Sequence, residues 1–172
     1  MIVLLRHLLA IAALPFVVTV LIPIWIARRY GMASPEQASM GIFAAQTVGF
    51  CLIAIGGLLF VHSVRRFAVD GEGTLAPWDP PRHLVVRGPY RYVRNPMISG
   101  VIFILFGEAL ILYSESHFLW AVSFLAINAL SIPLFEEPQL RQRFGEPYAE
   151  YCKHVPRLVP RLRPWQPATP PG

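Results

Sequence analysis

The chain has 172 residues, of which 55% are hydrophobic, and its mean hydropathy is +0.49. This composition excludes an ordinary soluble domain, and the length leaves room for only one membrane bundle. All 15 basic residues except Lys153 are arginine, which favours binding of carboxylates, phosphates or anionic lipid over nucleic acid, because they flank apolar stretches. Cys51 and Cys152 fit neither a disulfide nor the spacing of metal ligands, so we expect no metal site.

Four apolar stretches predict an all-α polytopic membrane protein with about four transmembrane helices. The predicted spans are residues 7–27, 40–62, 97–113 and 118–135. As a helix, the first stretch would be about 31 Å long, which matches a bilayer core. A cleaved signal peptide is the alternative, but the run is longer than a signal-peptide core and lacks a small-residue cleavage pattern. We expect residues 1–165 to form one domain and residues 166–172 to be a disordered tail.

The basic residues are unevenly distributed between the two sides of such a bundle. With the N-terminus inside, thirteen of the fifteen fall on one side, and only Arg28 and Arg29 fall on the other. Cytoplasmic loops are the ones that retain Lys and Arg. We therefore expect the loop 63–95 and the C-terminal segment 136–165 to lie together on the cytoplasmic side.

The loop 63–95 is rich in Gly and Pro, so we expect it to be largely irregular. A solvated linker is the alternative, but Trp78 and several other apolar residues argue against it. Residues 87–96 contain three arginines and two tyrosines immediately before the third span. These side chains are suited to an anionic, partly aromatic ligand.

A second polar cluster, Glu136-Glu137-Pro138, follows the fourth span. The residues after it predict a helix, a break at Gly145 and a second short helix on which Tyr148 and Tyr151 share a face. Two adjacent carboxylates at a membrane edge are costly unless a cation pairs with them, and Arg91 or Arg94 could do so. A pair of solvated glutamates at a helix end is the alternative.

Glu108 interrupts the third span. A carboxyl group at that depth faces a cavity or a partner. We favour a buried carboxyl bonded to Asn128, Ser123 or a backbone carbonyl over a group that lines an acceptor channel.

Together these segments resemble the isoprenylcysteine carboxyl methyltransferases and their bacterial relatives, within the broader group of membrane phospholipid methyltransferases. The resemblance rests on Gly88–Pro96, on Glu136–Leu140, and on Phe144–Tyr148 followed by Tyr151, with Asp79–Arg82 matching the bacterial members. It covers about half of the chain, residues 77–157. Where the family often carries His and Tyr, this chain has Asn95 and Ile98, and we expect that difference to affect the acceptor more than the cofactor.

The resemblance implies a methyltransferase that uses S-adenosylmethionine, with a helical cofactor pocket facing the cytoplasm, in the bacterial inner membrane. No Gly-x-Gly-x-x-Gly pattern of a soluble cofactor-binding fold is present. We expect Arg94, Glu137 and Arg91 to be catalytic. We expect the cofactor to contact Tyr90, Arg94, Asn95, Pro96, Gly100, Glu136, Glu137, Tyr148 and Tyr151.

The acceptor is expected to be lipophilic or small, with O-methylation of an isoprenylcysteine-type carboxylate as the first choice. N-methylation of a phospholipid and S-methylation of a small thiol are the alternatives within the family. Outside it, His7 and His62 could hold a haem at one membrane edge, or the chain could be a non-catalytic membrane scaffold. Membrane lipids are the other expected partners, and the sequence leaves the oligomeric state open.

Overall fold

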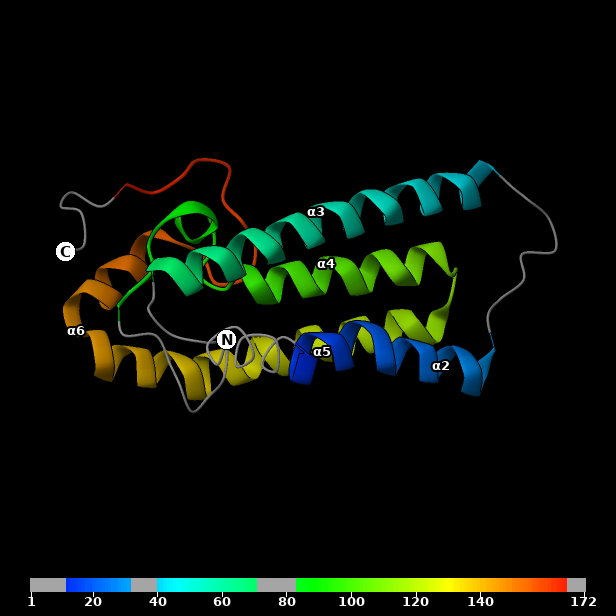
Figure 1. Cartoon of the computed structure of the whole chain (residues 1–172), viewed down its shortest axis with the longest axis horizontal. Helices are drawn as coiled ribbons and strands as arrows, with labels where there is room; N and C mark the ends of the chain where they lie inside the picture. The colour runs from blue at the N-terminus through cyan, green and yellow to red at the C-terminus, as the bar shows by residue number, and fades with distance from the viewer. Residues whose placement is uncertain (1–11, 32–39, 71–82, 167–172) are drawn as a thin grey trace. The chain divides into compact units, whose positions relative to one another are not determined.

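The computed structural model describes residues 12–31, 40–70 and 83–166. These residues are helical or irregular, with no strand among them, which confirms the all-α prediction. In chain order the elements are η1 (Ala12–Leu21), α2 (Ile22–Tyr30), α3 (Met40–Asp70), η2 (Gly88–Arg91), α4 (Pro96–Ile111), α5 (Glu115–Ser131), η3 (Ile132–Glu136) and α6 (Glu137–His154) (Figure 1). Residues 7–11 of the first predicted span, His7 included, and the predicted tail from residue 167 lie outside the described residues.

Two of the described helices are long and apolar enough to cross a membrane. The first is Met40–Phe67 in α3, and the second is the continuous helix Glu115–His154, which α5, η3 and α6 build together. The apolar part of the second helix precedes Glu136, because α6 is polar. α4 is apolar as well but shorter.

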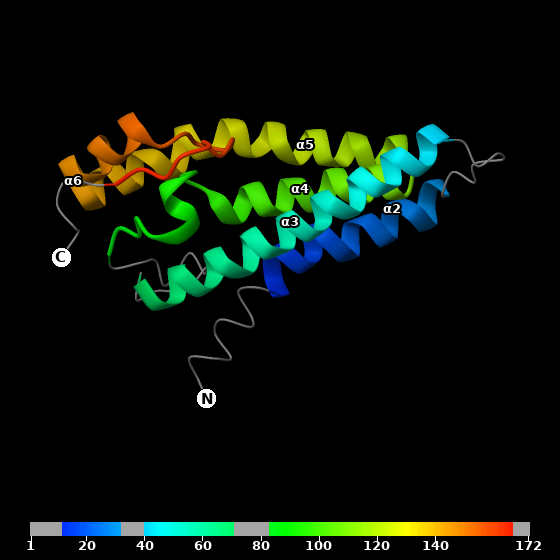
Figure 2. The same ribbon diagram turned by 90° about the horizontal axis from the view of Figure 1, so that it is seen from above.

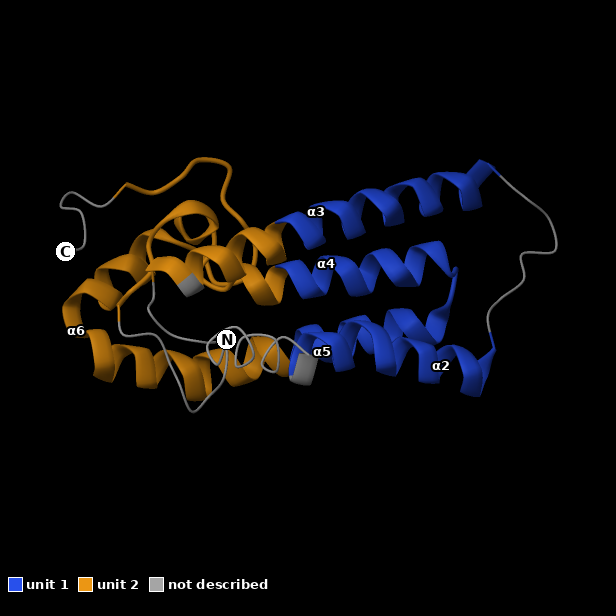
Figure 3. Ribbon diagram, in the orientation of Figure 1, with its two compact units in different colours: residues 1–58, 100–126 blue, residues 59–99, 127–172 orange. Residues whose placement is uncertain are grey.

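The chain divides into two compact units (Figure 3). Unit 1 contains residues 1–58 and 100–126, and unit 2 contains residues 59–99 and 127–172. Helices α3, α4 and α5 each contribute one end to unit 1 and the other end to unit 2.

In unit 1, α3 lies beside α4 (Figure 2), and the two helices pack through glycines. A Cβ atom at Gly49 would lie 2.7 Å from the carbonyl oxygen of Gly107, and one at Gly56 would lie 2.6 Å from that of Gly100. The backbones of the two helices therefore touch at two places, spaced seven residues apart on each helix. Close approach through small residues is a common way of joining helices in membranes.

A buried histidine and a tryptophan attach the N-terminal helical region to α5 in the same unit. His117 is 1% exposed, its Nε2 atom lies 3.1 Å from the carbonyl oxygen of Pro23, and its Nδ1 atom lies 2.8 Å from Oγ of Ser114. The indole Nε1 of Trp120 donates a hydrogen bond to the carbonyl oxygen of Val18. These contacts bind η1 and α2 to α5 at two points.

Glu108 also belongs to unit 1, and the sequence predicted a buried, hydrogen-bonded carboxyl there. Its Oε2 atom is buried and has no hydrogen-bond partner in the described part of the chain. The bonded carboxyl that the sequence led us to expect is thus not seen for this oxygen.

In unit 2, α3 continues to Asp70, so the start of the predicted loop 63–95 is helical and that expectation needs correction. Residues 63–70 contain neither Gly nor Pro, and nothing in them interrupts a helix. Asp70 forms ion pairs with Arg66 at 3.7 Å and with Arg87 at 3.8 Å. These pairs join the end of α3 to the start of the arginine-rich motif.

The helix widens at the end of the fourth predicted span and breaks farther on. In η3 the backbone N–H of Glu137 bonds to the carbonyl of Ile132, five residues earlier, and Pro138, which follows, has no N–H to donate. Farther on, Gly145 has φ 60° and ψ −136°, which breaks α6 as the sequence predicted. Beyond this break Tyr148 and Tyr151 enter an apolar cluster, completed by Val86, Val155, Leu84, Leu140, Phe144, Cys152 and Trp165.

Candidate active site

The C-terminal segment, residues 155–165, runs beside the arginine-rich motif in unit 2 and is fixed to it by backbone hydrogen bonds. The N–H of Arg94 donates to the carbonyl of Pro156 at 2.8 Å, and the N–H of Asn95 donates to that of Arg157 at 3.2 Å. Two further bonds run from the N–H of Arg161 to Tyr92 and from the N–H of Trp165 to Arg91. Residues more than sixty positions apart in sequence therefore form one framework.

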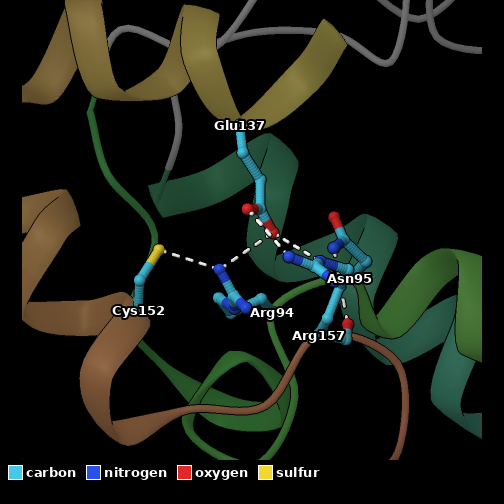
Figure 4. A network of polar contacts seen from close by, with 5 residues as sticks. All are labelled: Arg94, Asn95, Glu137, Cys152 and Arg157. Carbon is cyan, nitrogen blue, oxygen red and sulfur yellow. Dashed lines mark hydrogen bonds and ion pairs between the residues drawn. The ribbon is translucent and has the colours of Figure 1, made fainter. Parts of the chain in front are cut away.

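The centre of this framework is a carboxylate held by two arginines (Figure 4). Oε1 of Glu137 lies 2.9 Å from Nη1 of Arg94 and 2.6 Å from Nε of Arg157. Nη2 of Arg157 also donates to Oε2 of Glu137 at 3.1 Å. Arg157 thus holds the carboxylate with two donors, whereas Arg94 reaches one oxygen.

These charges change the titration of Glu137. Burial raises the pKa of the Glu137 carboxyl, but the hydrogen bond from Arg157 and the charges of Arg94, Arg157 and Arg141 outweigh burial, so the pKa lies below its usual value. Glu137 is therefore an anion at neutral pH. The alternative of a solvated glutamate at a helix end does not describe it, since its side chain is 9% exposed and paired.

Arg94 makes a second contact and keeps one donor free. Its Nη1 donates to Sγ of Cys152 at 2.9 Å, and its buried Nε has no hydrogen-bond partner among the described residues. A buried guanidinium with an unused N–H can donate a hydrogen bond to a further anionic or carbonyl group.

Three predicted tyrosines lie beside this centre as neutral, buried rings. The hydroxyl of Tyr151 donates to the carbonyl oxygen of Tyr90 at 2.6 Å, and Tyr148 packs against Tyr151 with ring centroids 6.2 Å apart. Burial raises the pKa of all three hydroxyls, so they remain protonated. The hydroxyl of Tyr90 is buried and has no partner in the described ranges.

Other predicted site residues take different places. Nε of Arg91 donates to the carbonyl of Trp165 at 2.7 Å, so Arg91 binds the C-terminal segment and not the glutamates. Glu136 is exposed, while Pro96 is buried and begins α4. Asn95 donates through its backbone N–H and its Nδ2 to the carbonyl of Arg157. Gly100 belongs to unit 1, where its carbonyl faces Gly56.

Two residues that contact the centre were missed from the sequence. Arg157 lies in the irregular segment after α6 and Cys152 near the C-terminal end of α6, and no local pattern marks a site at either residue. Their role depends on contacts with Glu137 and Arg94, which only the folded chain brings near them. The spacing of Arg157 from the Tyr148–Tyr151 pair carried no periodic signal that could have found it.

A hollow of about 600 Å³ lies elsewhere, in unit 1. Its lining includes Tyr30, Tyr113, Glu115 and Phe118 but none of the predicted site residues. We place the candidate active site at Arg94 and Glu137, because buried charges that hold one another and keep an unused donor are more specific than an open hollow. No cluster of three or more metal-binding side chains occurs in the described part of the chain.

Two curated proteins are similar to parts of this chain. Methanethiol S-methyltransferase 2 of Bradyrhizobium diazoefficiens is 37% identical over 73 residues, which is 42% of this chain and 27% of that protein. Protein-S-isoprenylcysteine O-methyltransferase B of Arabidopsis thaliana is 37% identical over 78 residues, which is 45% of this chain and 39% of that protein. The chain thus matches less than half the length of either relative, and no solved structure matches it significantly.

The sequence pattern of one family covers more than half of the chain. This pattern, described as phospholipid methyltransferase, matches residues 44–147. The matched range includes both Arg94, which precedes α4, and Glu137, the first residue of α6. The chain therefore belongs to the phospholipid methyltransferase family.

Proposed function

We propose that this protein is an integral membrane methyltransferase that transfers the methyl group of S-adenosylmethionine to a lipophilic or small acceptor. The observation that carries the proposal is that the family match includes the two partners of a buried ion pair, Arg94 and Glu137. Two relatives whose names describe methyl transfer to sulfur or oxygen support it. The sequence also points to the two segments that contain Arg94 and Glu137, because both are charged and adjoin a predicted span.

The side chains at the centre fit the chemical groups of the cofactor. Its carboxylate suits the unused Nε of Arg94, and its hydroxyl groups suit the remaining acceptor positions of Glu137. Its adenine suits an aromatic wall such as the rings of Tyr148 and Tyr151. The free hydroxyl of Tyr90 offers one more donor. When bound, the cofactor would supply an electrophilic methyl group, which is bonded to its sulfonium sulfur.

Transfer of a methyl group asks little acid or base chemistry of the protein. The chain must hold acceptor and donor in line and keep water away. A carboxylate or thiolate acceptor needs no general base, whereas an amine acceptor must lose a proton, and the exposed Glu136 could take it. Arg94 would orient an anionic group, and Arg91 would hold the C-terminal segment over the motif.

We propose four membrane spans, with the arginine-rich motif and the C-terminal segment facing the bacterial cytoplasm. The long apolar helices in α3 and in Glu115–His154 support two of the spans. The other two spans would be the apolar helical region formed by η1 and α2, and helix α4. The basic residues of unit 2 would then lie on the cytoplasmic side.

For the acceptor we propose an isoprenylcysteine-type carboxylate first and a small thiol second. The names of the two relatives favour these choices about equally. An aminophospholipid is the third choice, based on the family description.

The test is methyl transfer by the purified protein in lipid nanodiscs, with methyl-labelled S-adenosylmethionine and each acceptor in turn. We expect label in one acceptor and an equal amount of S-adenosylhomocysteine. Arg94→Ala and Glu137→Gln should each weaken cofactor binding in calorimetry, while the exposed Arg143→Gln should behave as wild type. A wild-type protein that binds no cofactor and labels no acceptor would contradict the proposal in favour of a scaffold.

A further inference from the structure

Arg157 makes more hydrogen bonds to Glu137 than Arg94 does, although it lies outside the two polar segments from which the sequence predicted the site. Its Nε and Nη2 atoms contact the two carboxylate oxygens at 2.6 and 3.1 Å. Two parallel hydrogen bonds from one guanidinium fix both the position and the plane of a carboxylate. The single contact from Nη1 of Arg94 leaves the carboxylate free to turn about that bond.

The backbone places Arg157 in register with the arginine-rich motif. The carbonyl of Arg157 accepts from the N–H and from Nδ2 of Asn95, and the carbonyl of Pro156 accepts from the N–H of Arg94. Ser99 adds a bond from its Oγ to the carbonyl of Leu158 at 2.7 Å. A shift of residues 156–158 would therefore disturb Arg94 and Glu137 together.

The charges in the centre suggest a division of labour. Arg94 and Arg157 bring two positive charges to the single negative charge of Glu137. Because Arg157 can neutralise Glu137 on its own, the charge of Arg94 and its unused Nε remain available to a ligand. The side chain of Arg157 is 36% exposed and that of Arg94 is 11% exposed, so Arg94 is the more enclosed partner.

We infer that Arg157 is a positioning residue, which holds Glu137 in one orientation and leaves Arg94 free to bind an anionic group of the methyl donor. This inference rests on the proposed function, since it assigns Arg157 to the same cofactor site. It extends that function by making the C-terminal segment part of the binding machinery.

The inference includes an effect on pH dependence. Arg94 from the motif, Arg157 from the C-terminal segment and Arg141 from α6 are the cations that act on Glu137. The charge of Glu137 in turn contributes to the raised pKa of the neighbouring Glu136 carboxyl and of the Tyr148 hydroxyl, whose main cause is burial. Without Arg157, Glu137 loses its hydrogen-bonded cation and holds its proton to higher pH. With lysine at position 157 the positive charge remains, but the pair of hydrogen bonds from one planar guanidinium is lost.

The test compares Arg157→Gln and Arg157→Lys with Arg163→Gln, which removes an exposed charge from the same segment. Calorimetry measures the affinity for S-adenosylmethionine, and isotope-edited infrared spectroscopy follows the Glu137 carboxylate band against pH in the absence of ligand. We expect Arg157→Gln to weaken cofactor binding about tenfold, as loss of a hydrogen bond to a charged group predicts. We also expect it to move the titration of Glu137 to higher pH.

Arg157→Lys should weaken cofactor binding less than Arg157→Gln does and leave the pH at which Glu137 titrates nearly unchanged. This variant also tests the inference if Arg157→Gln does not fold. If wild type and Arg163→Gln bind the cofactor and both Arg157 variants bind it equally well, the positioning role is overturned while the proposed function stands. If wild type binds no cofactor, the proposed function fails and the inference fails with it.

Discussion

Glu137 shows how a single residue links packing to charge in this chain. Its carboxylate is nearly buried, and it stays ionised because Arg94 and Arg157 both contact it. The desolvation cost of a buried carboxylate is therefore offset by two cations, one of which, Arg157, donates two hydrogen bonds. Removal of the negative charge would leave two guanidiniums side by side.

We predict that stability depends on pH through Glu137. Its pKa is lowered in the folded protein, so its contribution is complete above the usual carboxyl pKa of about 4.3 and is lost as the pH falls through the lower, folded value. At pH 7, the free energy of unfolding of Glu137→Gln should be about 1–3 kcal/mol lower than that of wild type. Thermal unfolding in detergent should show this difference shrinking below about pH 4. A difference that stays constant down to pH 3 would contradict the assignment.

A second prediction concerns the hydroxyl of Tyr151. It is the donor to the buried carbonyl of Tyr90, so Tyr151→Phe should leave that carbonyl without a partner and cost about 1–2 kcal/mol. The midpoint of thermal unfolding should fall by a few degrees. Tyr113→Phe removes a hydroxyl from a half-exposed ring in the same way and should leave the midpoint unchanged. Equal midpoints for the two variants would show that the Tyr151 bond does not stabilise the fold.

At the scale of elements, α3 and α4 approach each other through glycines. α3 carries two adjacent glycines that differ sharply in their surroundings. A Cβ atom at Gly56 would meet the Gly100 carbonyl at 2.6 Å, whereas a Cβ atom at Gly57 would meet nothing within 4 Å. Because the two glycines are adjacent in α3, alanine at Gly57 is a control for alanine at Gly56.

We predict opposite effects of alanine at these two sites. Gly56→Ala should force α3 and α4 apart and lower the midpoint of thermal unfolding. Gly57→Ala should be neutral or stabilise by up to about 1 kcal/mol, because alanine favours helix over glycine. Thermal unfolding in the same detergent measures both. A Gly56→Ala protein as stable as Gly57→Ala would mean that the two helices do not touch there.

Prediction from sequence succeeded where the signal was local. The break at Gly145 and the shared face of Tyr148 and Tyr151 followed from glycine and from helical spacing, and the structure contains both. The helical extension of α3 to Asp70 was missed, because the charged residues near Arg66 suggested that the span had ended. A helix does not have to stop where a membrane does.

The site was predictable only in part, for a related physical reason. The pairing of Arg94 with Glu137 could be proposed, since two charges at a membrane edge need each other. The pairing of Glu137 with Arg157, and of Arg91 with Trp165, depends on how the C-terminal segment returns to the motif. Hydrogen bonds between distant backbones leave no pattern in the sequence.

For the molecule as a whole, the distribution of charge argues for a definite orientation. Thirteen of the fifteen basic residues fall on one side of a four-span arrangement. The anionic cytoplasmic leaflet attracts such residues, each by about 1 kcal/mol near the surface. A cofactor made in the cytoplasm would then reach Arg94 and Glu137 without crossing the bilayer.

The orientation can be tested with single cysteines at two positions that the four-span arrangement puts on opposite sides of the membrane. In a Cys51→Ser, Cys152→Ser background, Leu162→Cys occupies a fully exposed position and Glu115→Cys an exposed position at the start of α5. We expect a membrane-impermeant maleimide to label Leu162→Cys only in inside-out vesicles and Glu115→Cys only in right-side-out vesicles. Denatured samples of each variant control for reactivity. Labelling of both cysteines from the same side would overturn the four-span arrangement, because an odd number of crossings must separate the two positions if the charge bias orients the chain.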